Sequence, residues 1–319
     1  MKTEISTDRT AAVELLRQGE VVALPTETVY GLAADALNPI AVAKIFEAKE
    51  RPRFDPLIVH LPDRDWLEKV ADFFDEDRQL ILKLTERFWP GPFTMVLPRR
   101  EIIPELVTAG LETVAVRISA HPVFAAIVNA FGKPLAAPSA NRFGKISPTT
   151  AQHVLDELNE RIPLIIDAGS TEHGIESTIV AIRNGKIEML RRGPIVPELL
   201  SEFGEVEIAT AGKKVFAPGQ LASHYAPKTL LRLIDNAKSF SVEGSQRIGL
   251  LAWNPIESQK FAAIRNLSEH HDLREAAANL FRCLRELDAL GLNLIVAERV
   301  PTQGLGAAIM DRLQRASHR

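Results

Sequence analysis

The sequence predicts a mixed α/β protein with two domains, and three observations support this prediction. The chain has 319 residues, about twice the length of a common single domain. Hydrophobic residues make up 46% of it and charged residues 25%, a balance typical of folded globular proteins. Short apolar segments of strand type alternate with amphipathic segments of helical period, and the order of these segments changes near residue 230.

The N-terminal domain, residues 1–207, is expected to hold a mixed sheet with flanking helices. Asp8 can cap the first helix, and Pro39 begins the second. Asn184-Gly185 between two apolar segments indicates a hairpin. The patterns predict strands at residues 21–24, 57–60, 94–97, 114–118, 135–137, 164–167, 177–183 and 186–190, and helices at 8–17, 39–49, 65–70, 77–88, 121–131 and 149–158.

The rest of the chain is predicted to be a linker followed by a smaller domain. Residues 208–229 lack periodicity and carry two prolines and two glycines, which is typical of a linker. Residues 230–319 alternate strand-type and helical segments. Strands are expected at 230–234, 248–253 and 292–298, and helices at 273–290 and 307–316. This alternation indicates βαβ units and a small parallel sheet.

Composition excludes several classes of protein. A single cysteine, Cys283, rules out a disulfide framework, a cysteine-rich zinc site and an iron–sulfur cluster, and it is typical of the reducing cytosol. The polar N-terminus has no apolar core of a signal peptide, and no apolar segment approaches the roughly 20 residues of a membrane helix. We therefore expect a cytoplasmic protein. The net charge of −3 provides no overall basic field for nucleic acid.

Common catalytic motifs are absent from the sequence. Gly169 and Gly174 have the spacing of a phosphate loop, but Ile175-Glu176 stands where such a loop needs Lys-Ser or Lys-Thr. Gly304-Leu305-Gly306 lacks the third glycine of a dinucleotide-binding turn. His270-His271 has no metal-ligand spacing, and no serine-hydrolase elbow is present.

Polar and basic residues gather instead at the predicted strand ends of the N-terminal domain. Because strand ends meet at one rim of an α/β sheet, these residues predict a site for a small polyanionic ligand. Arg117 lies within an apolar strand and needs a partner there. Alternatives remain for the others: Lys49 and Arg51 as solvated surface residues, Thr26 as a turn residue, and His60 as a core histidine. The residues by themselves indicate an anion-binding α/β enzyme.

Eight stretches of the sequence, in this order, resemble the YrdC-like family. They are PTETVYGL (25–32), KERPRFDPLIVH (49–60), FWPGPFT (88–94), TVAVRISAHP (113–122), APSAN (137–141), SPT (147–149), GIESTIV (174–180) and LRRG (190–193). The linker APGQLASHYAP resembles that of the two-domain members. The resemblance implies a YrdC-like twisted mixed sheet, and a Rossmann-like C-terminal domain that matches the parallel sheet predicted above.

The resemblance also implies an activity. Enzymes of this kind form L-threonylcarbamoyladenylate and pyrophosphate from L-threonine, bicarbonate or CO2, and ATP, with Mg2+ carried on the ATP phosphates. The product serves the threonylcarbamoyladenosine modification beside the anticodon of tRNA. The implied partners are these substrates and a transient handover to the tRNA threonylcarbamoyl-transferase complex, with at most weak binding of tRNA and no membrane.

By the same resemblance, residue roles can be assigned position by position. The linker 208–229 would cover the active site. No catalytic residue is implied firmly, and His60 is the candidate base. The L-threonine contacts would be Thr26, His60, Arg117, Ala137 and Ser177; the ATP contacts Lys49, Arg53, Thr113, Ser139, Ser147, Arg191 and His224; and the supporting residues Arg51, Asn141 and Tyr225.

The sequence departs from the family pattern at a few positions. Ser119 and Arg192 stand where proline is usual, and the linker has Gln220 and Ala222-Ser223 in place of the usual residues.

Two other functions are compatible with parts of the sequence. A non-catalytic RNA-binding or ribosome-associated module would use the cationic rim, although the net charge argues against it. A different carbamoyl-adenylate chemistry occurs in hydrogenase maturation proteins that contain a YrdC-like domain. Those proteins carry zinc fingers, which one cysteine excludes.

Overall fold

The computed structural model describes residues 2–209, 224–241, 245–256 and 258–318. The chain divides into two compact units. Unit 1 comprises Met1–Phe143, Pro148–Thr171 and Glu176–Gln220, and unit 2 comprises Gly144–Ser147, Glu172–Ile175 and Leu221–Arg319. Two short segments from within the predicted N-terminal domain, residues 1–207, therefore belong to unit 2. Most of the predicted linker, residues 210–223, lies outside the described residues.

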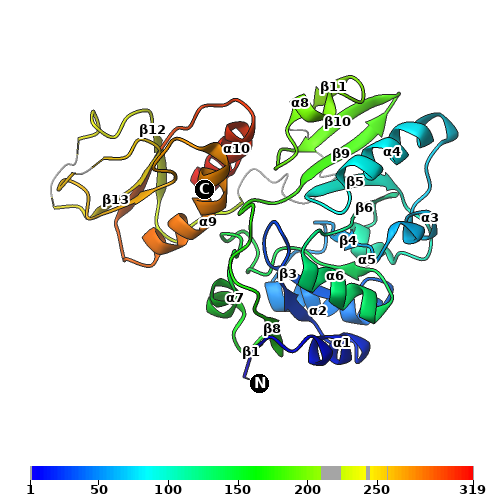
Figure 1. Ribbon diagram of the computed structural model, residues 1–319. Coiled ribbons are helices and arrows are strands. Elements are labelled where there is room, and N and C mark those ends of the chain that lie inside the picture. Colours follow the sequence, from blue (N-terminus) through cyan, green and yellow to red (C-terminus); the bar gives the residue numbers. More distant parts are fainter. Residues whose placement is uncertain (1, 210–223, 242–244, 257, 319) are drawn as a thin grey trace. The chain divides into compact units, whose positions relative to one another are not determined.

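Unit 1 is built on a mixed sheet, as the sequence predicts (Figure 1). Within the described residues it has eleven strands in the order β1-β8-β2-β3-β7-β4-β6-β5-β9-β10-β11. Some neighbours are parallel, such as β4 and β6, and others antiparallel, such as β5 and β6. The strands are β1 (Glu4–Ser6), β2 (Val22–Leu24), β3 (Gly31–Asp35), β4 (Ile58–His60), β5 (Phe93–Pro98), β6 (Thr113–Arg117), β7 (Leu135–Ala136), β8 (Leu164–Ile166), β9 (Thr178–Arg183), β10 (Lys186–Arg191) and β11 (Val206–Ile208).

Helices cover both faces of this sheet because side chains alternate along its strands. Val22 and Leu24 of β2 pack in one cluster with α1 and α6, whereas Ala23 packs in the other with α2. The helices of unit 1 are α1 (Arg9–Arg17), α2 (Pro39–Lys49), the 3-10 turn η1 (Arg64–Trp66), α3 (Leu67–Val70), α4 (Asp75–Phe88), α5 (Glu105–Thr108), α6 (Pro122–Phe131), α7 (Ala151–Leu158) and α8 (Pro197–Leu200).

Local signals explain where several elements begin or turn. The Asp8 side chain accepts hydrogen bonds from Thr10 N (2.8 Å) and Ala11 N (3.2 Å) and so caps α1. Pro39 opens α2 within its first turn. Asn184 and Gly185 both have positive φ, at 52° and 72°, which closes the β9–β10 hairpin. These predictions are confirmed.

The structure adds elements that the sequence patterns did not predict. β3 has the sequence GLAAD, and its small residues have low strand propensity and no alternation of polar and apolar side chains. It forms because it is buried on both sides, between β2 and β7 and under α2. β1 and β11 are three-residue strands at the two edges of the sheet, too short for a periodic signal.

Unit 2 contains the parallel sheet that the sequence predicts. In the described part of the chain its strands are ordered β12-β15-β13-β14, and each neighbouring pair is parallel. Leu250 and Val296 lie fully buried in its core. Its elements are β12 (Leu231–Ile234), β13 (Ile248–Ala252), β14 (Ala263–Asn266), α9 (Leu273–Asp288), β15 (Leu294–Glu298) and α10 (Leu305–Ser317).

Two kinds of feature are absent from the described residues. None of their helices combines the length and the apolar character that crossing a membrane requires. Nor do three or more His, Cys, Asp or Glu side chains of the described part gather so that they could hold a metal ion.

Candidate active site

Arg117, at the end of β6, is the centre of the first group of site residues. Its side chain is only 3% exposed, so its charge requires a partner. That partner is Glu27, also 3% exposed, which follows β2 and pairs with Arg117 Nη2. Arg117 Nη1 donates to Thr28 Oγ1 over 3.4 Å. Among the described residues, Arg117 Nε has no hydrogen-bond partner. Protein groups thus bind one part of the guanidinium, and its Nε is buried without a partner among the described residues.

The turn after β2 is held by its own hydroxyl groups. Thr26 Oγ1 and Thr28 Oγ1 are 2.8 Å apart, and Thr26 Oγ1 donates to Val29 O over 2.6 Å. Thr26 is therefore a turn residue, which was one of the two alternatives for it from the sequence. It also lies two residues before Thr28, whose hydroxyl accepts a hydrogen bond from Arg117. From the sequence, Glu27 belongs with Thr26 and Thr28 to the polar residues that follow a predicted strand, but no role was assigned to it. The signal was its position between the two threonines, where an apolar strand has just ended.

His60 lies beside Arg117 because β4 and β6 pair in parallel with these two residues in register. The imidazole is 2% exposed and packs against Phe124, with ring centroids 4.7 Å apart. Burial, and then the positive charge of Arg117, lower the pKa of His60 well below its ordinary value, against a smaller raising effect of the Ala137 backbone. The ring is therefore neutral at pH 7 and a weak base.

Two further candidates lie close to these strands. Ala137 N donates to Ile58 O over 2.9 Å, which places Ala137 next to β4. Ser177 immediately precedes β9 and accepts a hydrogen bond from Arg191 Nη2 at 3.0 Å, while Arg191 Nε donates to Ser177 O. Thr94 Oγ1 lies 2.8 Å from Ser177 Oγ and was not identified from the sequence. Because the parallel pairing of β5 with β9, 83 residues apart in sequence at this contact, brings Thr94 near Ser177, no local pattern could have indicated it.

Lys49, at the end of α2, is the centre of a second group. It is 1% exposed, so its interpretation as a solvated surface residue is wrong. Its Nζ donates to the carbonyl oxygens of Ser139 and Asn141, which brings three predicted residues together. Burial, and then the nearby charge of Arg51, lower the pKa of Lys49 well below its ordinary value. An anion bound next to Lys49 would raise this pKa again and so stabilise the protonated ammonium form.

Arg51 is also buried, and it holds the loop that follows α2. It pairs with Asp55 at 2.8 Å and donates to Pro56 O at 2.8 Å. Burial raises the pKa of Asp55, although the charges of Arg51, Lys49 and Arg191 oppose this. Those three cations therefore lie within electrostatic reach of one fully buried carboxyl group. Asp55 was missed from the sequence, where it stands as the one acid of the loop RPRFDP.

Two residues of unit 1 that were predicted to contact ATP, Arg53 and Thr113, make no described contact with the Arg117 group or the Lys49 group. Arg53 is exposed at the turn of the same loop. Thr113 opens β6 opposite Pro98, at the other end of the strand from Arg117. Thr113 and Arg117 are four residue steps apart along an extended strand, which amounts to about 13 Å.

Three predicted residues, Ser147, His224 and Tyr225, belong to unit 2. Tyr225 has a positive φ of 64° and is 1% exposed. Its ring stacks on Phe281 with centroids 5.4 Å apart, and the Arg312 guanidinium lies 5.5 Å from its centroid. The His224 ring meets Tyr225 edge-on at 4.1 Å.

The segment that carries Ser147 is bound by α9 and by the residues after His224. Arg285 of α9 donates to Ile146 O and Ser147 O, and Ala226 N donates to Gly144 O over 2.9 Å. Unit 2 thus holds the backbone around Ser147.

A pH dependence follows from the Arg117 group. Burial raises the pKa of Glu27, but the Arg117 charge and the Ser119 hydrogen bond lower it by more, so the folded-state pKa lies below the ordinary value of 4.5. The corresponding stabilisation is fully present above that value and is lost as the pH falls through the folded-state pKa. Wild type and Glu27→Gln are therefore expected to differ in urea stability at pH 7 and to converge in acid. If the stability difference between wild type and Glu27→Gln stayed constant from pH 7 into acid, the charge of Glu27 would not be its cause.

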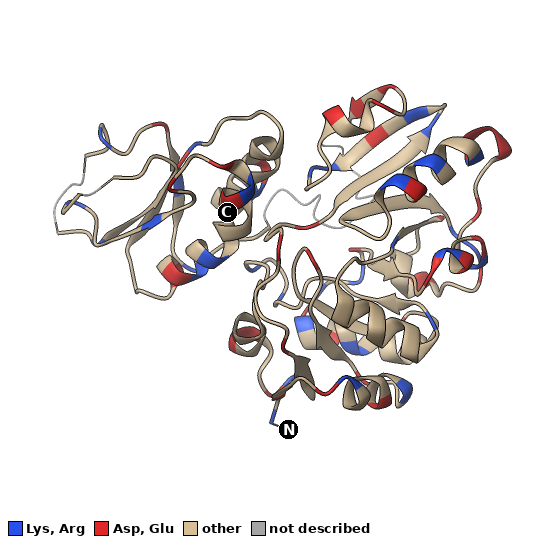
Figure 2. Ribbon diagram, in the orientation of Figure 1, with Lys and Arg blue, Asp and Glu red and all other residues tan. Residues whose placement is uncertain are grey.

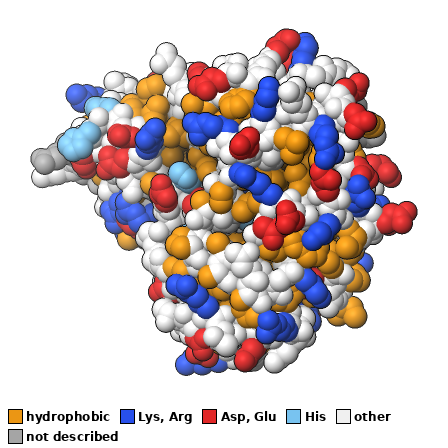
Figure 3. Space-filling view, turned by 45° about the vertical axis from the view of Figure 1, so that its right-hand side comes forward, with side chains coloured by type: hydrophobic (Ala, Val, Ile, Leu, Met, Phe, Trp, Pro, Cys, Tyr) orange, Lys and Arg blue, Asp and Glu red, His pale blue; other side chains and the backbone are white. Residues whose placement is uncertain are grey.

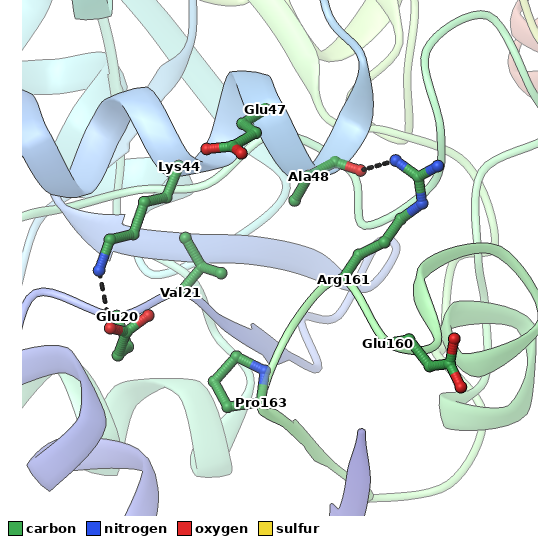
Figure 4. A pocket seen from close by; sticks show the side chains of 8 residues that line it. All are labelled: Glu20, Val21, Lys44, Glu47, Ala48, Glu160, Arg161 and Pro163. Atoms are coloured by element: carbon green, nitrogen blue, oxygen red, sulfur yellow. Dashed lines mark hydrogen bonds and ion pairs between the residues drawn. The ribbon is translucent and has the colours of Figure 1, made fainter. Parts of the chain in front are cut away.

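Two cavities lie apart from these groups. The larger, of about 430 Å³, is lined by charged residues of α2 and of the segments before β2 and β8 (Figure 4). Lys44 pairs there with Glu20 at 2.7 Å, and Arg161 donates to Ala48 O. A smaller cavity of about 230 Å³ lies in unit 2 after the ends of β12, β13 and β15. No predicted site residue lines either of them.

Known proteins resemble this chain over nearly its whole length. A family model described as "Telomere recombination", for Sua5, YciO and YrdC proteins, matches residues 14–193, and one described as "Threonylcarbamoyl-AMP synthase, C-terminal domain" matches residues 186–318. Proteins named threonylcarbamoyl-AMP synthase from Pyrococcus abyssi and Bacillus subtilis are each 39% identical; both comparisons cover 96% of this chain, and 93% and 92% of the relatives.

Solved structures agree with these matches. The P. abyssi Sua5 structure in complex with L-threonine has a TM-score of 0.90 and 36% identity, covering 99% of this chain and 98% of that one. Escherichia coli YciO, at 20% identity, shares the fold over 60% of this chain with a TM-score of 0.51. The mixed sheet, the second parallel sheet and the similarity along both units lead to one conclusion: the chain belongs to the family of two-domain threonylcarbamoyl-AMP synthases.

Proposed function

We propose that this chain forms L-threonylcarbamoyladenylate and pyrophosphate from L-threonine, bicarbonate and ATP. The observation that carries the proposal is the pair of buried cationic groups in unit 1, one around Arg117 and one around Lys49. An amino-acid carboxylate and a triphosphate are the two anions that such a reaction must hold. The similarity to a protein crystallised with L-threonine supports the first of these ligands.

For L-threonine, the proposal uses the part of the Arg117 guanidinium that has no partner among the described residues. Nε, which lacks a partner among the described residues, would donate to the substrate carboxylate. Thr26, Ala137 and Ser177 would contact the rest of the amino acid. His60 is neutral and a weak base, which favours hydrogen bonding to the substrate over removing its proton.

For ATP, the proposal places the phosphates at Lys49 and Arg191. Both lie within electrostatic reach of Asp55, and Lys49 also holds the backbone of Ser139. Arg51 and Asn141 support this group through the loop and carbonyl contacts described above. Arg53, Thr113, Ser147 and His224 are further proposed contacts that rest on the sequence resemblance. Mg2+ would arrive as the metal complex of the substrate ATP and neutralise phosphate charge.

The reaction then needs two bond-forming steps. Bicarbonate gives CO2 and hydroxide; the neutral amine of threonine attacks CO2 to form a carbamate, and the proton that the nitrogen loses combines with the hydroxide to form water. A carbamate oxygen attacks the α-phosphorus, and pyrophosphate leaves with the electron pair of the broken P–O bond. The protein contributes alignment and charge neutralisation. A desolvated amine site assists because burial disfavours the ammonium form.

The setting of this reaction is part of the same proposal. We assign catalysis to residues 1–207, joined by the linker 208–229 to the smaller domain 230–319. The product would pass transiently to the tRNA threonylcarbamoyl-transferase complex, and the cytoplasm is the compartment where ATP and tRNA meet. As a rival, an RNA-binding module is disfavoured because basic and acidic side chains are interspersed along the ribbon and on the face in view (Figures 2 and 3).

Pyrophosphate release by the purified full chain tests the proposal. With MgATP present, release is expected only when L-threonine and bicarbonate are both added, and the product is expected to contain the threonine carbon skeleton. Release without threonine would contradict the assignment. Absent release, combined with tRNA binding that weakens steeply with salt, would favour the RNA-binding alternative.

A further inference from the structure

Ser119, two residues after β6, binds the same carboxylate as Arg117. It is 3% exposed, and its hydroxyl donates to Glu27 Oε2 while accepting from His121 N at 3.2 Å. The other oxygen, Glu27 Oε1, accepts from Arg117 Nη2. Each oxygen of Glu27 therefore has its own donor, and the buried carboxylate is fixed in one orientation.

This orientation limits how much of Arg117 the protein itself uses. A guanidinium has five N–H groups in a planar fork, and a carboxylate that is free to turn prefers to bind two of them in parallel. Because Ser119 holds Oε2, Glu27 contacts Arg117 through a single oxygen. Arg117 Nε stays without a partner among the described residues. A second carboxylate can thus bind the same guanidinium.

We propose that Ser119 is a positioning residue for L-threonine: by holding one oxygen of Glu27, it keeps Glu27 to a single contact and leaves N–H groups of Arg117 for the substrate carboxylate. This inference rests on the proposed function. Without the hydroxyl, Glu27 turns onto Arg117 with both oxygens and competes with the substrate. Binding of ATP, proposed above to take place at the Lys49 group, does not depend on this contact.

Ser119→Ala tests the idea in the full chain, with pyrophosphate release as the assay. We expect the KM for L-threonine to rise about tenfold, which corresponds to about 1.4 kcal/mol. Both kcat and the KM for ATP are expected to stay within about twofold, because the reacting atoms and the ATP contacts are untouched. Ser119→Thr keeps the hydroxyl and is expected to restore most of the affinity for threonine.

Ser268→Ala is a closely matched control in unit 2. Ser268 is 1% exposed, donates to Glu275 Oε2 and accepts from His270 N at 3.1 Å and from Asp272 N at 2.9 Å, so the substitution removes the same kind of hydrogen bond to a carboxylate and one accepted bond more. The urea stability of Ser268→Ala is expected to fall at least as much as that of Ser119→Ala. Its KM for L-threonine is expected to remain that of wild type. If Ser119→Ala and Ser268→Ala raised the KM for L-threonine equally, Ser119 would have only a structural role and the inference would be wrong.

The remaining outcomes also decide the question. An unchanged KM for threonine in Ser119→Ala, with an active wild type, overturns this inference and leaves the proposed function intact. An inactive wild type overturns the proposed function first. Should Ser119→Ala fail to fold, Ser119→Cys supplies a weaker donor of similar size, and calorimetric titration is expected to show weakened threonine binding. A crystal structure of the alanine variant should show both Glu27 oxygens on Arg117; a single contact would contradict the mechanism.

Discussion

Arg117→Ala is expected to lower kcat/KM for L-threonine by a factor of about 10²–10³, the usual effect of removing a charged group that holds a reacting species. It is also expected to lower the free energy of unfolding by about 3–5 kcal/mol, because Glu27 would be left as a buried charge without its cation. Pyrophosphate release and urea unfolding measure the two effects. The stability loss follows from the structure, because the sequence showed that Arg117 needs a partner but did not identify Glu27 as that partner.

A double variant separates these two effects. Adding Glu27→Ala to Arg117→Ala removes the stranded carboxylate, so part of the stability should return. Activity with threonine should not return, because the group that binds the substrate carboxylate is still missing. Recovery of both together would mean that Arg117 serves folding only, and wild-type kcat/KM in the single variant would remove it from the threonine site.

Lys49→Met is expected to have the second large effect, on ATP rather than on threonine. Loss of the ammonium should lower kcat/KM for ATP by a factor of about 10²–10³. The folded state should be as stable as wild type or more stable, because a buried ammonium is replaced by an apolar side chain of similar length. Kinetics at varied ATP and urea unfolding at pH 7 provide the measurements.

The pH dependence of stability gives an independent check on Lys49. Its pKa in the folded state lies well below the ordinary value of 10.5, so folding must release its proton or bury its charge. This penalty is greatest below the folded-state pKa and disappears as the pH rises past the unfolded-state value. The stability advantage of Lys49→Met should therefore shrink in alkali. Lys44→Met, on the same helix but at the surface, should change neither kinetics nor this pH profile.

Most helices and strands could be predicted because their signals are local. The Asn38 cap and Pro39 lie next to the start of α2, and the predicted end at Lys49 agrees with the structure. The Asn184-Gly185 turn likewise defines its hairpin from two residues. β3 could not be predicted, since its alanines become a strand only through burial between β2, β7 and α2.

The candidate site shows the same division. Residue type and order were enough to identify Arg117 as a charge that needs a partner and to indicate the family. Lys49 was left open as a surface residue, and only the family resemblance assigned it to ATP. Their partners could not be identified from neighbouring residues, because Glu27 precedes Arg117 by 90 residues and Ser139 follows Lys49 by 90. Such pairs are made by strand order and register in the sheet, and by the demand that a charge removed from water be neutralised. A sequence pattern depends on a few neighbouring residues, and these residues determine neither the order and register of the strands nor which distant charge neutralises a buried one.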